Sequence, residues 1–89
     1  MKSYQKGYRF ERKVKKFLEE KGYFVIRQGK SSFPDLIAIK NKKVIFVECK
    51  INKYLSKKEK IKAEEIKEKT KYPFTVFYES NRKIKCYGV

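Results

Sequence analysis

The sequence predicts an α/β fold in one domain, in which a helix, three strands, a second helix and two strands follow one another. Three observations support this order. An apolar stripe with helical spacing lies near the N-terminus, a helix-capping pattern follows residue 55, and short runs rich in Val, Ile and Phe are bounded by turn residues. At 89 residues with 40% hydrophobic side chains, the chain supports one small core. We therefore expect a single domain over residues 1–89, which oligomerisation would help to stabilise.

The first helix is expected over residues 8–21. Its apolar side chains recur at three- and four-residue intervals and form one stripe: Phe10, Val14, Phe17 and Leu18. Gly22 comes next and is expected to end the helix, because glycine adopts the left-handed backbone of a C-cap at little cost.

The remaining elements follow from turn residues and apolar runs. Strands are expected over residues 23–27, 35–39 and 43–49, and again over 74–78 and 83–87 around a turn at 80–82. Between these two groups, Ser56 and Glu59 have the spacing of a capping box, and helical propensity continues to about Lys69. This second helix has a thin apolar face, made mainly by Ile61, Ala63 and Ile66.

The second and third strands are expected to place two carboxylates side by side. The turn at 40–43 is short enough for an antiparallel hairpin. Pairing Lys40 with Lys43 and counting outward brings Asp35, the only aspartate in the chain, opposite Glu48, with Cβ atoms about 5 Å apart. Like charges so placed are destabilising unless a cation lies between them, and hard divalent ions prefer oxygen ligands. The register therefore predicts a magnesium or manganese site.

Strand alternation predicts which groups accompany this pair. Glu48 and Lys50 share one face of the third strand and are expected to emerge together at its end, beside Asp35. A plainer interpretation makes Glu48 and Lys50 a surface ion pair and Asp35 a turn residue after Pro34. The combination of spacing, facing and order favours catalysis over that interpretation.

Charge and composition restrict the partners. Twenty-five Lys and Arg against 10 acidic residues give a net charge of +15 and favour nucleic acid, although Lys- and Glu-rich surfaces also occur in hyperthermophile proteins. The absence of histidine excludes Ser-His and Cys-His catalysis and disfavours zinc. Cys49 and Cys86 lie in apolar runs and are expected to be buried thiols. With no long apolar stretch, we expect an intracellular, cytoplasmic and nucleoid-associated protein that does not bind membranes.

Pro34-Asp35 with Glu48-Cys49-Lys50 resembles the motif of the PD-(D/E)xK nuclease superfamily, and the whole chain resembles the archaeal Holliday junction resolvases within it. Further matches are the segments 7–12 and 20–23 and the serines before Pro34. The resemblance implies a restriction-endonuclease-like domain with a mixed central sheet flanked by helices. It also implies a magnesium-dependent, structure-selective endonuclease that resolves four-way junctions by paired symmetric nicks. The alternatives are another nicking or repair nuclease of the superfamily, or a non-catalytic basic DNA-binding protein.

The resemblance also assigns roles at the site. Asp35 and Glu48 would hold one or two Mg²⁺ ions, with Mn²⁺ as a substitute and the backbone carbonyl of Cys49 as a further ligand. Lys50 would orient or help to deprotonate the attacking water and offset negative charge. Glu11, which projects onto the border of the apolar stripe of the first helix, would complete the metal site. No small-molecule cofactor is expected.

A serine before the motif aspartate is implied to act on the substrate. Ser32 is favoured over Ser31 as a hydrogen-bond donor to phosphate, although adjacent serines in a loop are often simple turn formers. The chain departs from its relatives in a short loop over residues 27–35, in ending soon after the fifth strand, and in Lys58-Glu59-Lys60, where superfamily members often carry a glutamine.

DNA and a second copy of the chain are the expected partners. Phosphate contacts are expected at positions around the site: Lys2, Lys6, Arg9, Arg12, Lys30, Ser31 and Lys53. Symmetric cutting requires two active sites, so a homodimer is expected. Four aromatic residues are candidates for its interface, with packing on the sheet as the alternative for them: Phe74, Phe77, Tyr78 and Tyr87.

Overall fold

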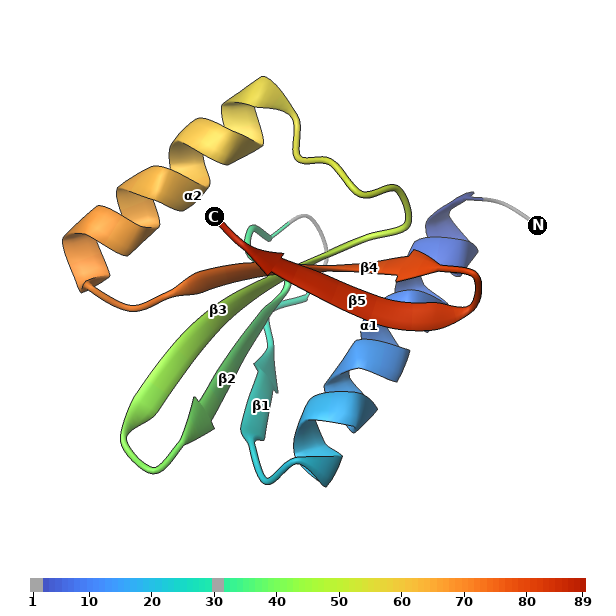
Figure 1. Ribbon diagram of the computed structural model, residues 1–89, viewed down its shortest axis with the longest axis horizontal. Helices are drawn as coiled ribbons and strands as arrows, with labels where there is room; N and C mark the ends of the chain where they lie inside the picture. The colour runs from blue at the N-terminus through green and yellow to red at the C-terminus, as the bar shows by residue number, and fades with distance from the viewer. Residues whose placement is uncertain (1–2, 30–31) are drawn as a thin grey trace.

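The elements of the computed structural model follow the predicted order (Figure 1). The structure describes residues 3–29 and 32–89, with side chains from Gly7 onward. The elements are α1 (Ser3–Glu20), β1 (Phe24–Arg27), β2 (Leu36–Lys40), β3 (Lys43–Lys50), α2 (Lys57–Thr70), β4 (Phe74–Ser80) and β5 (Lys83–Gly88). Helix α1 begins five residues earlier than expected, because the polar residues before Tyr8 carry no apolar periodicity that would reveal a helix.

The five strands form one mixed sheet in the order β1-β2-β3-β4-β5. Neighbouring strands are antiparallel except for β3 and β4, which are parallel. Parallel neighbours need a crossover connection, and α2 provides it. Strand β3 therefore lies at the centre of the sheet, where both of its edges are paired.

Two tight turns fix the registers of the antiparallel hairpins. Asn41 and Lys42 connect β2 to β3 with φ angles of 51° and 67°, and Asn81 and Arg82 connect β4 to β5 with 51° and 64°. Two central residues with positive φ are the signature of the type I′ turn, whose twist matches that of the flanking strands. Lys40 pairs with Lys43 as predicted.

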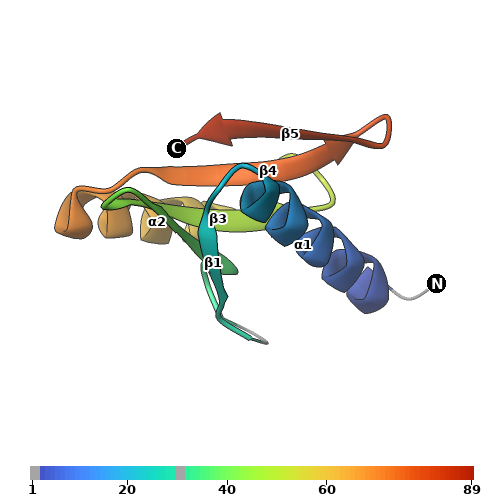
Figure 2. The same ribbon diagram turned by 90° about the horizontal axis from the view of Figure 1, so that it is seen from below.

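The two helices pack on opposite faces of the sheet (Figures 1 and 2). Phe10, Val14 and Leu18 of α1 share one core cluster with Leu36, Val47 and other strand residues. Ala63 of α2 packs with Phe74 and Val76 in a second cluster. Successive strand residues point to opposite faces of the sheet. Val47 therefore points toward α1, whereas Glu48 points toward the face that α2 covers.

Two burial predictions are wrong, each because of where a helix lies. Ile61 is 64% exposed, since α2 contacts the sheet through the face that carries Ala63. Cys86 is exposed, because β5 is an edge strand and α1 packs mainly against β1 and β3. Phe74 and Phe77 are buried in the two cores, which confirms the alternative of packing on the sheet and leaves neither available for a dimer interface.

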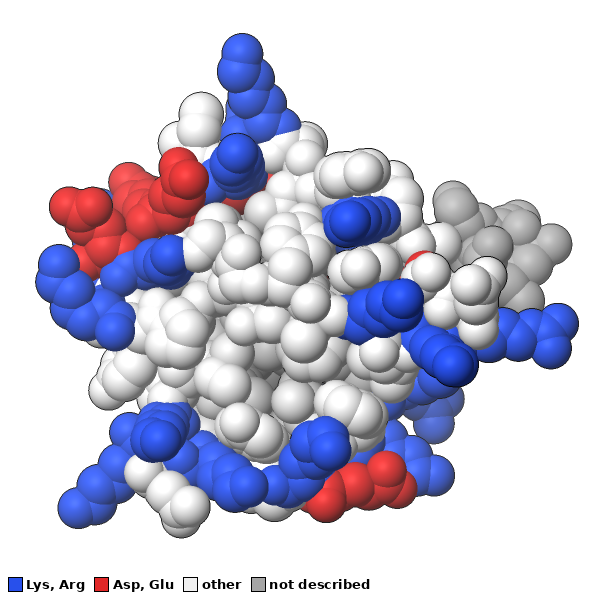
Figure 3. Space-filling model, viewed as in Figure 1, with Lys and Arg blue, Asp and Glu red and all other residues white. Residues whose placement is uncertain are grey.

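Basic side chains dominate the surface. On the face drawn in Figure 3, Lys and Arg surround an uncharged centre, and acidic residues gather mainly beside α2. Over residues 3–29 and 32–89, no helix combines the length and apolar character needed to cross a bilayer.

Candidate active site at the end of strand β3

Asp35 and Glu48 meet where the β2–β3 ladder ends. The last paired residues are Leu36 and Val47, so Asp35 lies one residue beyond the ladder. The backbone N–H of Asp35 donates to Oε1 of Glu48 at 3.1 Å, and that of Cys49 donates to Oδ2 of Asp35 at 2.9 Å. The predicted juxtaposition of the two carboxylates is confirmed.

The carboxylate of Glu48 is more buried than expected. Glu48 is only 6% exposed, so it does not emerge from the strand end as predicted, because the N-terminal turn of α2 lies against this face. Burial, together with the charge of Asp35, raises the pKa of Glu48 to about 8. Burial also raises the pKa of Asp35, against the hydrogen bond from Cys49, and the charge of Glu11 adds to the increase. Both acids therefore resist ionisation more than exposed carboxylates do, even with the charge of Lys50 beside them.

Lys50 is held by two acids. Its Nζ lies 2.7 Å from Oε2 of Glu59 and 3.6 Å from Oε2 of Glu48. Burial alone would lower the pKa of Lys50, but the hydrogen bond to Glu59 and the charges of both acids raise it. Lys50 therefore stays protonated, which suits the compensation of negative charge better than the removal of a proton from water.

Glu59 connects the start of α2 to strand β3. Its Oε1 accepts from the backbone N–H of Ser56 at 2.9 Å, and its own N–H donates to the Ser56 hydroxyl at 3.1 Å, which completes the predicted capping box. The other oxygen of the same carboxylate binds Lys50. The sequence located Glu59 through its capping role, but it held no signal for the contact with Lys50.

Glu11 lies on α1, where Arg27 of β1 binds it. The Nε of Arg27 lies 2.5 Å from Oε1 of Glu11, and the Arg27 guanidinium lies 4.9 Å from the centre of the Tyr8 ring. The charge of Glu11 still reaches Asp35. Among the residues that the structure describes, no three His, Cys, Asp or Glu side chains gather closely enough to hold a metal ion. The metal-binding role of Glu11 stays a prediction, and Arg27 is a partner that the sequence did not indicate.

The chemistry of the carboxylate pair fits a hard divalent cation. Asp35 and Glu48 offer oxygen donors only, in surroundings where burial penalises uncompensated negative charge. A divalent ion would stabilise both ionised carboxylates. It would thereby offset the burial and the like-charge repulsion that raise their pKa values. Nitrogen and sulfur donors, which zinc prefers, do not contribute: the chain has no histidine, and burial and the charge of Asp35 raise the pKa of the Cys49 thiol.

Ser32 belongs to the loop before Asp35. Its hydroxyl donates to the carbonyl of Gln28 at 3.2 Å, and its N–H donates to the carbonyl of Gly29 at 3.4 Å. The hydroxyl thus has the turn-forming contact that was the alternative to phosphate binding, and its catalytic role stays a prediction. Ser31 and Lys30 lie outside the described residues, as does Lys2.

The predicted DNA contacts fall in two places. Arg9 and Arg12 are exposed on α1, where they border a shallow hollow together with Lys13 and Lys16. Lys6 is in α1, but its side chain lies outside the described part. Lys53 follows strand β3, in the loop that leads to α2.

A family model for archaeal Holliday junction resolvases (Hjc) matches residues 2–83. The chain belongs to this family. The matched range includes Asp35, Glu48 and Lys50 as well as Glu11 and Glu59, so the whole candidate site lies within it.

A curated protein and a solved structure are similar to this chain. The crossover junction endodeoxyribonuclease Hjc of Methanocaldococcus jannaschii is 47% identical over 47 residues, which is 53% of this chain. The match spans about a third, 35%, of the length of that curated relative. The structure of Archaeoglobus fulgidus Hjc, a Holliday junction resolvase from an archaeal hyperthermophile, superposes with a TM-score of 0.79 at 24% identity. That match covers 93% of this chain and 72% of the other, and it supports the predicted mixed α/β fold.

Proposed function

We propose that this protein is a magnesium-dependent endodeoxyribonuclease that cuts four-way DNA junctions by paired symmetric nicks. The observation that carries the proposal is the convergence of Asp35, Glu48 and Lys50 at one end of the central strand β3. A basic DNA-binding protein without catalysis would gain nothing from a buried and a half-buried acid whose pKa values are raised. Membership of the Hjc family and the names of its relatives favour a junction as the substrate.

The residues of the site divide the chemistry between them. Asp35 and Glu48 would hold one or two Mg²⁺ ions, or Mn²⁺ in their place, with the Cys49 carbonyl and Glu11 as further ligands. When bound, such an ion polarises the phosphodiester and promotes attack by water. Lys50, held by Glu59, would orient that water and offset the charge that develops on the phosphate.

The basic surface would hold the substrate. Arg9, Arg12 and Lys53 are assigned to phosphates, together with Lys2, Lys6, Lys30, Ser31 and Ser32. Contacts of this kind position DNA by its shape more than by its sequence. A twofold homodimer would present two active sites to one junction, as symmetric nicking requires. A protein with this substrate would act where the DNA is, inside the cell.

One assay tests the proposal. The protein is incubated with a synthetic four-way junction and with linear duplex, in magnesium or in chelator, beside Asp35→Asn and Glu48→Gln. Glu65→Gln is the matched control, because this exposed acid of α2 forms its ion pair with Lys69 of the same helix, at 3.5 Å.

We expect paired nicks near the branch point from the wild type and Glu65→Gln, and none from the two site variants or in chelator. Cutting of linear duplex at the same rate as the junction would contradict junction selectivity. Binding by every form without cutting in any metal would contradict the nuclease itself.

A further inference from the structure

A second hollow borders the candidate active site. Its volume is about 460 Å³, and it lies between the loop after β3, the first turns of α2 and the end of β5. The side chains that give it chemical character are Lys53, Tyr54, Lys60, Glu64 and Tyr87. None of the roles assigned above uses this combination of aromatic rings with lysines.

One wall of the hollow is fixed. The Tyr87 hydroxyl donates to the Lys53 carbonyl at 2.8 Å, and the Tyr78 and Tyr87 rings lie 6.0 Å apart at 55°. The Lys53 ammonium lies 5.7 Å from the centre of the Tyr78 ring. These contacts tie the loop after β3 to strands β4 and β5.

Tyr54, by contrast, presents its ring to solvent. It is 71% exposed and lies outside both core clusters of the described residues. The Lys53 ammonium lies 5.9 Å from the centre of its ring. A large aromatic surface left in water beside a cation is the arrangement with which proteins stack a nucleobase and hold its phosphate.

The hollow is continuous with the catalytic strand. Lys53 and Tyr54 follow Lys50 within four residues, in the loop that leads to the Ser56 cap of α2. The charge of Lys50 also reaches the Tyr87 hydroxyl. A strand whose phosphate is at Asp35 and Glu48 would therefore pass close to this hollow.

We propose that this hollow is a subsite for one unstacked nucleobase of the substrate strand, which stacks on Tyr54 while Lys53 and Lys60 hold the adjoining phosphate. Glu64 makes the hollow a poor site for phosphate alone and offers an acceptor to the amino groups of a base edge. The inference rests on the proposed function, because it assigns to that nuclease a subsite for the branch point. Unstacking a base at a branch costs less free energy than unstacking one inside a duplex, so the subsite would favour junctions over linear DNA.

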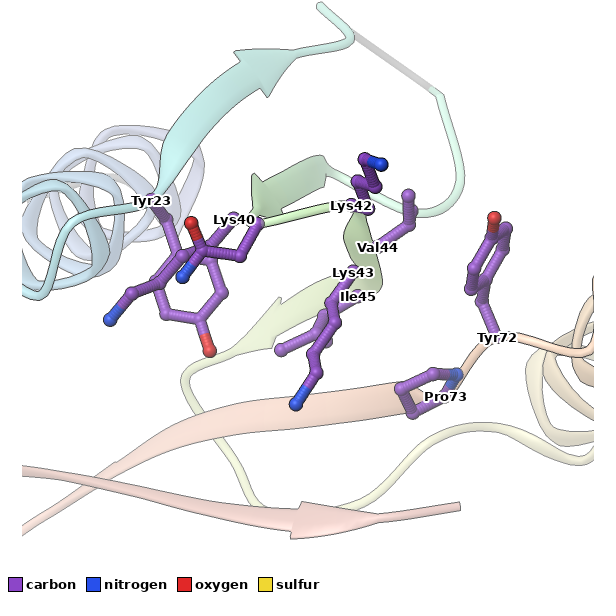
Figure 4. A pocket seen from close by; sticks show the side chains of 9 residues that line it. Tyr23, Lys40, Lys42, Lys43, Val44, Ile45, Tyr72 and Pro73 are labelled. Atoms are coloured by element: carbon purple, nitrogen blue, oxygen red, sulfur yellow. The ribbon is translucent and has the colours of Figure 1, made fainter.

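A hollow of similar composition at the opposite end of the sheet provides the control (Figure 4). It measures about 420 Å³ and is lined by Tyr72, which is 41% exposed, with Lys42 and Lys43. Lys43 and Lys50 are the two ends of the eight-residue strand β3, which at about 3.3 Å per residue places them roughly 20 Å apart. A base held there would be too far from Asp35 to guide its cleavage.

The test uses a four-way junction with 2-aminopurine at the branch point, whose fluorescence reports stacking on tyrosine. Binding is measured in chelator, so that no DNA is cut, for the wild type, Tyr54→Ala, Tyr54→Trp and Tyr72→Ala. A linear duplex with internal 2-aminopurine is titrated in parallel. Cleavage of the unlabelled junction in magnesium is measured separately for the same four proteins.

We expect the wild type, Tyr54→Trp and Tyr72→Ala to quench the probe, and Tyr54→Ala to lose the quenching with at least about fivefold weaker junction binding. The duplex should respond equally to all four. Equal behaviour of Tyr54→Ala and the wild type, or equal losses in Tyr54→Ala and Tyr72→Ala, would overturn the subsite even if the junction is cut. Tyr54-dependent quenching without cleavage in magnesium would support the subsite and overturn the proposed function.

Discussion

The two ends of strand β3 have similar surroundings but differ in their buried groups. Lysines and an exposed tyrosine border both ends, as Lys43 with Tyr72 and as Lys53 with Tyr54. Among the described residues, only the second end has a buried carboxylate, that of Glu48, beside the half-buried Asp35 just beyond the β2–β3 ladder. A basic and aromatic surface is therefore common to both ends and, under the proposed function, would serve DNA binding in general. The acids at one end distinguish a reaction site from a binding surface.

Removing a carboxylate at the acidic end should have the largest effect. Asp35→Asn and Glu48→Gln should each lower the rate of junction cleavage by about 10²–10³-fold or more, since each removes a preorganised group for the metal and the transition state. Lys43→Ala at the other end should leave the rate within about twofold. Single-turnover cleavage in magnesium measures both. A similar loss for Lys43→Ala would show that the two ends are not functionally distinct.

The support of Lys50 by Glu59 should have the next largest effect. Glu59→Gln keeps one oxygen that can accept from Ser56, but its NH₂ group then faces the Lys50 ammonium, so both the hydrogen bond to Lys50 and the negative charge beside it are lost. We expect cleavage to fall about tenfold while junction affinity and unfolding midpoint change little.

Ser56→Ala is the control for this prediction, because it should change stability and not cleavage. It removes the hydroxyl that caps α2 and should lower the free energy of unfolding by about 1 kcal/mol, with cleavage nearly unchanged below the melting temperature. Cleavage and unfolding are measured on both variants. If Glu59→Gln lost stability but no cleavage, Glu59 would be only a helix cap.

The acidic end should also make stability depend on pH. In the unfolded chain Glu48 loses its proton near its ordinary pKa of 4.5, whereas in the folded protein it keeps the proton up to a pKa of about 8. The unfolded state therefore binds fewer protons in this interval, so without metal the contribution of Glu48 to stability is full below pH 4.5 and is lost as the pH rises through 8. Urea unfolding in chelator should show this decrease for the wild type relative to Glu48→Gln. Parallel pH profiles for the two proteins would contradict it.

The smallest effect is expected at the β2–β3 turn. Lys42 has a φ angle of 67°, which glycine adopts without steric cost, and Asn-Gly is a preferred type I′ pair. Lys42→Gly should raise the free energy of unfolding by up to about 1 kcal/mol and leave the cleavage rate unchanged. Thermal unfolding and the junction assay measure the two quantities, and a loss of cleavage would indicate that this end takes part in the reaction.

The sequence predicted what local rules determine. The short turn at Lys40–Lys43 sets the register, and the register alone places Asp35 against Glu48. The Ser56 capping box located the start of α2 in the same way. In each case the decisive interaction joins residues close together in the chain or follows from one hairpin.

What the sequence did not predict depends on how distant elements pack. The contact of Arg27 with Glu11 requires β1 to lie against α1, and the burial of Glu48 requires the first turn of α2 to lie over the end of β3. Cys86 is in an apolar run like that of Cys49, yet it is exposed because it lies on an edge strand, whereas α1 packs mainly against β1 and β3. Local patterns cannot specify which helix covers which strand.

We propose above all that Asp35 and Glu48 together hold a divalent metal ion, and direct metal binding tests this without DNA. Manganese is titrated into the wild type, Asp35→Asn, Glu48→Gln and the control Glu65→Gln, and free Mn²⁺ is measured by electron paramagnetic resonance. We predict saturable binding to the wild type and Glu65→Gln and a loss of that binding in both site variants. Equal manganese binding by all four proteins would contradict the claim.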